Sequence, residues 1–155
     1  MSAGAGSPAS AQRLLTFEVG ASLYALPIAH VLEVAEVEEL ALVPTLPAST
    51  GGVVNLHGDA LPVLRRSALF DVVEAELPAP AHLLVVAGRP DQPGRLGVPV
   101  DRIVGLVDGS GAASRGGELV AERRPIAGRV VGIVDPRVLM VRAREAIERA
   151  LGPAT

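Results

Sequence analysis

The stretch GGVVNLHGDALPVL, residues 51–64, decides the fold of this chain. It consists of an apolar run, a turn at residues 55–58, and a second apolar run that contains Pro62. Asn and Gly accept the positive φ angles that a sharp reversal requires, so the chain is expected to turn back on itself between the two runs. The stretch therefore predicts two antiparallel strands joined by a tight turn.

A similar pattern recurs about 70 residues further along the chain. Residues 58–64 match residues 128–134 at an offset of 70, and residues 26–31 match residues 98–103 at an offset of 72. The two matches occur in the same order and at nearly the same offset. They predict two copies of one small β unit, because a period of this length is not that of a solenoid.

Each copy is expected to consist of short strands separated by turns that contain Gly and Pro. About five strands per copy favour small barrels, which remove free sheet edges by curling. The first lobe should span about residues 13–73 and the second about residues 81–141, after a disordered N-terminal tail over residues 1–12. The predicted strands are 14–19, 22–26, 31–37, the two runs of the opening stretch, 83–87, 96–100, 103–107, one near Leu119, and 130–134.

Helices are expected mainly near the C-terminal end. Asp135 is a good N-cap residue and Pro136 suits the first helical position, which predicts a single turn through Met140. Apolar residues then recur at i, i+4, i+7 and i+8, which predicts a C-terminal helix over about residues 142–151 that packs on the barrels. The Gly- and Ser-rich residues 105–117 are expected to form a mobile loop.

The opening stretch resembles the signature of the CheW-like family, G-V-x-N-L-R-G-x-x-x-P-V-x-D-L. His57 stands where the family has arginine, and Arg65 and Arg66 stand where it has Asp-Leu. The resemblance covers roughly residues 14–140 and is most specific in the first lobe. It implies a mostly β fold of two SH3-like five-stranded barrels related by a pseudo-twofold axis. The matching residues are Gly52, Val53, Asn55, Leu56, Gly58, Pro62 and Val63.

The resemblance also implies a function. Members of the family are non-catalytic adaptors that couple chemoreceptors to a CheA-type histidine kinase in chemotaxis, a two-component system. The cytoplasmic helical hairpin of the receptor would dock in the groove between the lobes, at Val31, Glu33, Asn55 and His57. The regulatory domain of the kinase would be held by another surface, to which no residue is assigned.

Two alternatives accompany this interpretation of the site. Val31 and Val34 equally suit a place in the core, with Glu33 facing solvent. His57 is shorter than arginine and lacks its permanent charge, and Arg65 inverts the charge of the family's aspartate. A divergent adaptor for a non-chemotactic kinase pathway, of motility or gene regulation, is therefore the alternative function within the family. Loss of the aspartate should also remove an N-cap, at a cost of about 1 kcal/mol.

The sequence contains no recognisable catalytic or metal-binding constellation. It has no cysteine and no lysine, which excludes thiolate sites and a P-loop. His30, His57 and His82 lie 25 to 27 positions apart, without the short spacing of a metal pair, and the glutamates of residues 36–39 suit a solvated strand end. We expect no enzyme activity, no cofactor and no metal. The rival is a small-molecule enzyme on a β-barrel scaffold, which would need titratable groups converging in a deep pocket.

Charge and hydropathy limit the partners further. The formal net charge of −3 gives no basic footprint for nucleic acid. The longest uncharged stretch, residues 40–56, is interrupted by Pro and Gly, whereas a membrane span needs about 20 predominantly apolar residues. The first 12 residues lack the charged and apolar regions of a secretory signal. A cytoplasmic protein without direct membrane insertion is expected.

Overall fold

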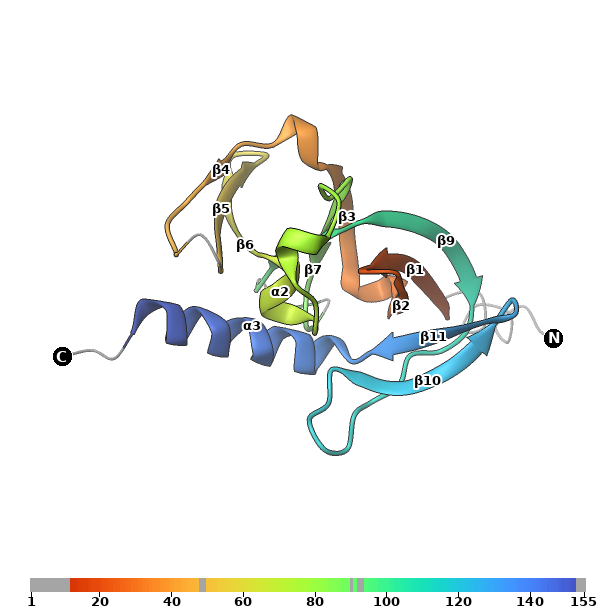
Figure 1. The fold of residues 1–155 in the computed structure, drawn as a ribbon. Helices are drawn as coiled ribbons and strands as arrows, with labels where there is room; N and C mark the ends of the chain where they lie inside the picture. Colours follow the sequence, from red (N-terminus) through yellow and green to blue (C-terminus); the bar gives the residue numbers. More distant parts are fainter. Residues whose placement is uncertain (1–11, 48–49, 90, 92–93, 153–155) are drawn as a thin grey trace.

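The computed structural model describes residues 12–47, 50–89, 91 and 94–152. The fold is mostly β, with one long helix along one side (Figure 1). The predicted disordered tail, residues 1–12, lies outside the described residues except for Gln12. The strands are β1 (Arg13–Val19), β2 (Ser22–Pro27), β3 (Val31–Glu36), β4 (Leu42–Val43), β5 (Gly51–Leu56), β6 (Asp59–Leu64), β7 (His82–Val86), β8 (Leu96–Val100), β9 (Arg102–Asp108), β10 (Val120–Ile126) and β11 (Arg129–Val134). The helical segments are η1 (Ile28–His30), η2 (Val37–Glu39), α2 (Arg66–Leu69), η3 (Glu74–Glu76) and α3 (Pro136–Leu151).

The strands form two sheets, which confirms the predicted fold class of two β lobes with short helical turns and a C-terminal helix. The five-stranded sheet has the order β10-β11-β2-β1-β9, and the six-stranded sheet has the order β3-β7-β8-β6-β5-β4. Each half of the chain therefore gives its first hairpin to one sheet and its later strands to the other. In this the sheets differ from the sequence-contiguous lobes expected over about residues 13–73 and 81–141.

The two sheets are nevertheless built on one plan. β11 runs parallel to β2 with Ile133 opposite Ala25, and β6 runs parallel to β8 with Val63 opposite Gly97. Val63 and Ile133 are 70 residues apart, and Ala25 and Gly97 are 72 apart, which are the two offsets of the repeat. The matched segments occupy equivalent strands, so the predicted equivalence is confirmed.

The core explains why the halves exchange hairpins. The largest apolar cluster lies between the sheets and draws residues from β1, β7, β8 and α3, whereas two smaller clusters each belong mainly to one sheet. All five residues of β8 and four of the five in β7 are buried, so these strands are covered on both faces. The two halves share one interior, since each half alone would be of marginal size for a stable core.

α3 is one continuous helix, not the turn and separate helix expected from the sequence. The N-cap prediction is confirmed, because Asp135 accepts a hydrogen bond from the Arg137 backbone N–H at 2.9 Å. Beyond this cap, Leu139, Ala143 and Ala146 form a buried stripe with helical spacing. This stripe crosses the expected break, so packing extends the first turn directly into the longer helix.

The loop expected over residues 105–117 begins later in the structure. Gly105 belongs to β9, and its carbonyl accepts a hydrogen bond from Thr16 Oγ1 at 2.9 Å. Ser114 in the remaining loop donates its backbone N–H to Asp135 at 2.8 Å. A hydrogen bond from the Ser114 hydroxyl, followed by those from the backbone N–H groups of Glu118 and Gly116, lowers the pKa of Glu118. These contacts anchor the loop to the start of α3.

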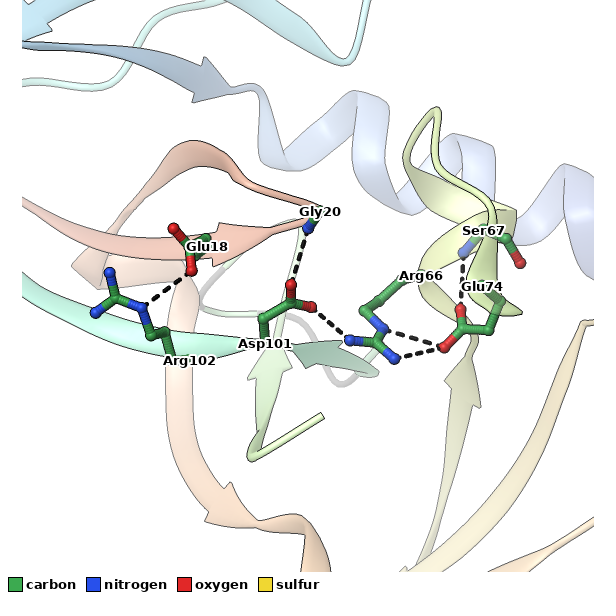
Figure 2. Close-up of polar contacts among 7 residues, drawn as sticks. All are labelled: Glu18, Gly20, Arg66, Ser67, Glu74, Asp101 and Arg102. Carbon is green, nitrogen blue, oxygen red and sulfur yellow. Dashed lines mark hydrogen bonds and ion pairs between the residues drawn. The ribbon is translucent and has the colours of Figure 1, made fainter. Parts of the chain in front are cut away.

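Arg66 is a buried charge at the junction of the two sheets (Figure 2). Its side chain is 2% exposed and pairs with Glu74 at 2.7 Å and with Asp101. Glu74 also accepts the Ser67 backbone N–H, and Asp101 accepts that of Gly20. Because Asp101 connects β8 to β9, the cluster joins α2 and η3 to the crossing between the sheets and to the β1–β2 turn. The predicted loss of an N-cap on the preceding residue is also confirmed, because α2 has no side-chain cap.

Candidate functional site

The turn between β5 and β6 carries two of the four residues assigned to the candidate receptor site. His57 and Gly58 both have positive φ, at 54° and 87°, which is the backbone of a tight two-residue hairpin turn. The Asn55 side-chain oxygen accepts the Gly58 backbone N–H at 3.0 Å. Asn55 therefore fixes the shape of the turn, and His57 lies at its tip.

Glu33 and His57 are brought together by the curl of the six-stranded sheet. His57 Nε2 lies 2.9 Å and 3.0 Å from the two carboxylate oxygens of Glu33. β7 and β8 separate β3 from β6 in the sheet order, so this contact requires the sheet to bend round on itself. The side chains are 72% exposed for His57 and 36% for Glu33. A pair this exposed contributes about 0–1 kcal/mol to stability, so its polar groups are free to serve recognition.

β3 divides its apolar residues between the interior and the surface. Val31 is partly buried and packs against the apolar cluster between the sheets. Leu32 and Val34 are 42% and 43% exposed. The core alternative thus holds for Val31, whereas Val34 faces solvent together with a neighbour, Leu32, that the sequence reasoning did not single out.

β9 repeats this surface in the other sheet. Val104 and Leu106 follow Leu32 and Val34 by 72 residues and are 43% and 51% exposed. We call these four residues the edge-strand apolar pairs, since β3 and β9 each end a sheet. Scattered exposed apolar residues are ordinary in proteins. Their recurrence at equivalent positions of two edge strands instead indicates a binding surface, because free edges are usually protected by charge.

A register shift at each edge strand made these pairs hard to predict. The pairing of β3 with β7 passes from Val31 to Glu33, and the pairing of β9 with β1 passes from Ile103 to Gly105. The residue between is left out of the ladder, as in a β-bulge. The only sequence signal was the match of residues 31–34 to residues 103–106 at the repeat offset.

The Glu33–His57 pair has no counterpart in the other sheet. The positions equivalent to Glu33 and His57 hold Gly105 and Ala127, although Ala127 has the same positive φ, at 51°. The turn geometry is therefore shared by both copies, and the charged groups belong to one copy alone. This asymmetry gives the six-stranded side a polar rim beside its apolar pair.

The described residues contain no group of three or more His, Cys, Asp or Glu side chains that could hold a metal ion. The histidines lie in separate settings: His57 at the β5–β6 turn, His82 at the start of β7, and His30 with Nδ1 2.9 Å from the Ala87 carbonyl oxygen. Within the same residues, no helix is long and apolar enough to cross a membrane.

Comparison with known proteins gives three findings. The sequence profile of the CheW-like domain matches residues 13–144. A chemotaxis protein CheW of Treponema pallidum (strain Nichols) is 30% identical over 98 residues, which are 61% of this chain and 56% of that relative, so the match spans just over half of the relative's length. The scaffolding protein TtCheW of Thermoanaerobacter tengcongensis has a similar structure, with a TM-score of 0.66 and 17% identity over 83% of this chain and 91% of that chain. At this identity the likeness concerns the fold alone.

Proposed function

Because this chain belongs to the CheW-like domain family, we propose that it is a non-catalytic cytoplasmic adaptor of chemotaxis signalling. It would couple the cytoplasmic hairpin of a chemoreceptor to the regulatory domain of a CheA-type histidine kinase. The mechanism is bivalent binding: the receptor changes how the kinase is held, and no chemistry takes place in the adaptor.

The edge-strand apolar pairs carry this proposal. Leu32 and Val34 on β3, and Val104 and Leu106 on β9, are large apolar side chains that remain exposed at equivalent positions. A helical hairpin presents two antiparallel helices, each with an apolar stripe. Two equivalent apolar strips on the adaptor therefore suit two helices of one receptor tip, because each helix finds the same kind of contact.

The four residues assigned from the family resemblance take different parts in this proposed receptor site. Glu33 and His57 form the polar rim, and Asn55 holds the turn that presents His57. Val31 supports β3 from inside, because it packs against the core. The divergent adaptor of a non-chemotactic kinase pathway remains the second candidate. One observation favours it: His57 is already paired with Glu33, so the position offers a partner less charge than the family's arginine would.

Val34→Glu tests the apolar contact directly. We expect this substitution to weaken binding of a purified chemoreceptor cytoplasmic hairpin by more than about tenfold, since a carboxylate buried in an apolar contact costs a few kcal/mol. Isothermal titration calorimetry measures the affinity. The melting temperature should change little, because Val34 is 43% exposed.

Val130→Glu is the matched control for this experiment. Val130 is 63% exposed on β11, away from both edge strands, so the same substitution there should leave receptor binding unchanged. Equal affinities of the Val34 and Val130 variants would argue against a receptor contact at β3. Val31→Glu would be less informative, because the new charge would disturb the core.

His57→Arg restores the family's residue at the turn. We expect receptor affinity to stay within about threefold of that of the parent protein, because the new guanidinium would pair with Glu33 instead of the partner. The double variant Glu33→Gln, His57→Arg leaves the arginine available, and we expect it to bind an acidic or carbonyl-rich tip about tenfold more tightly than Glu33→Gln alone. Titration of the four proteins against the same receptor hairpin measures both effects. A tenfold gain from His57→Arg alone would show that Glu33 does not hold the side chain back.

A further inference from the structure

A basic trough lies alongside α3, distant in sequence from the proposed receptor site. It is a cavity of about 540 Å³ between α3, α2 and the loop before β10. We call it the α3 trough. No ion pair involves its three arginines among the described residues, although the trough includes one carboxylate, Glu145. The lining residues that matter are Arg137, Arg142, Arg149 and Glu145, with Val138 and Val141 as apolar neighbours.

A second surface has the same mixed character and the opposite charge. Glu38 and Glu39 on η2 are exposed, and Leu42 and Val43 on β4 are 43% and 57% exposed. We call these four residues the acidic ridge. Neither glutamate forms an ion pair within the described part of the chain. Two carboxylates next to two aliphatic side chains complement a trough with a charge of +2 and an apolar wall.

The ridge and the trough lie on opposite sides of the molecule. β4 is at the top of Figure 1, and α3 runs along the bottom. The two surfaces of one copy therefore do not meet. We propose that the α3 trough binds the acidic ridge of a second copy of this chain. This contact is heterologous, so it leaves one free trough and one free ridge at the ends of every assembly, and repetition forms a chain or a ring of copies.

Sedimentation velocity of the full chain at increasing protein concentration tests this association. At low salt the weight-average sedimentation coefficient should rise with concentration, and the rise should diminish as salt screens the exposed charges. Arg142→Glu with Arg149→Glu, or Glu38→Arg with Glu39→Arg, should each weaken self-association at least tenfold, because like charges then face each other. A parent protein that stays monomeric at millimolar concentration and low salt would overturn the proposal.

Mixing the two charge-reversed variants is the decisive step. The reversed trough of one variant is then complementary to the reversed ridge of the other, and their unaltered surfaces also match. An equimolar mixture should regain association to within about threefold of the parent protein, while each variant alone remains monomeric. Arg123→Glu with Arg129→Glu changes the same amount of charge on β10 and β11, outside the trough, and should associate like the parent. Failure of the mixture to recover, or equal loss in this control, would contradict the proposed contact.

Discussion

Arg66→Ala is expected to lower the free energy of unfolding by about 3–5 kcal/mol, which is typical for breaking a buried ion pair by removing one partner. The substitution leaves the carboxylates of Glu74 and Asp101 without their cation, and the Asp101 side chain is only 8% exposed. Their remaining donors, the backbone N–H groups of Ser67 and Gly20, do not neutralise two negative charges. Urea denaturation followed by circular dichroism measures the change.

Arg102→Ala is the matched control for this loss. Arg102 pairs with Glu18 at 3.0 Å, but its side chain is 53% exposed, so the pair should contribute about 0–1 kcal/mol. Similar losses in the Arg66 and Arg102 variants would show that the buried cluster does not stabilise the junction of the sheets. A second control replaces Arg66 by Met together with Glu74→Gln and Asp101→Asn. It should recover much of the lost stability, because no charge is then left buried without a partner.

Gly51→Ala should be about as damaging, with a loss of about 3 kcal/mol or more. Gly51 has a φ of 150°, which L residues rarely adopt, and a Cβ there would lie 2.0 Å from the carbonyl oxygen of Val63. That oxygen belongs to the backbone of the paired strand β6, so it cannot move aside without breaking the ladder. The variant should therefore lose its cooperative thermal transition or melt far below the parent protein.

Gly105→Ala provides the comparison in the other sheet. Gly105 also lies in a strand, β9, but no heavy atom comes within 4 Å of the position of its missing Cβ. Alanine there should change stability by less than about 1 kcal/mol, with a small gain expected from the stiffer unfolded chain. Equal melting temperatures for the two variants would contradict the role given to Gly51.

The strands and their equivalence were accessible from the sequence, whereas the exchange of hairpins was not. Residues 51–64 predicted a hairpin because alternation and turn residues are local signals, and the repeat offsets located its counterpart. Which sheet a strand joins is decided by contacts between distant segments. β1, β7 and β8 are buried on nearly every position, so no polar face indicated their neighbours. Arg66 was unexpected for the same reason, since Asp101 lies 35 residues further along the chain.

The candidate site was predicted in part. Glu33 and His57 were assigned to one surface, and the structure places them in contact. Asn55 proved to be bonded within its own turn, and Val31 packs inward. The exposed Leu32 was missed because the register shift of β3 depends on its pairing with β7, and strand periodicity alone cannot locate such a shift.

The exchange of hairpins has a consequence for synthesis on the ribosome. Arg13 of β1 pairs with Asp108 of β9, 95 residues later, and β2 pairs with β11, which is made later still. The first hairpin therefore leaves the exit tunnel long before the strands on either side of it exist. Contacts this distant slow folding, and they expose apolar surface in the meantime. Neither sheet can be completed as a nascent unit, so the molecule reaches its final form only after β11 has been translated.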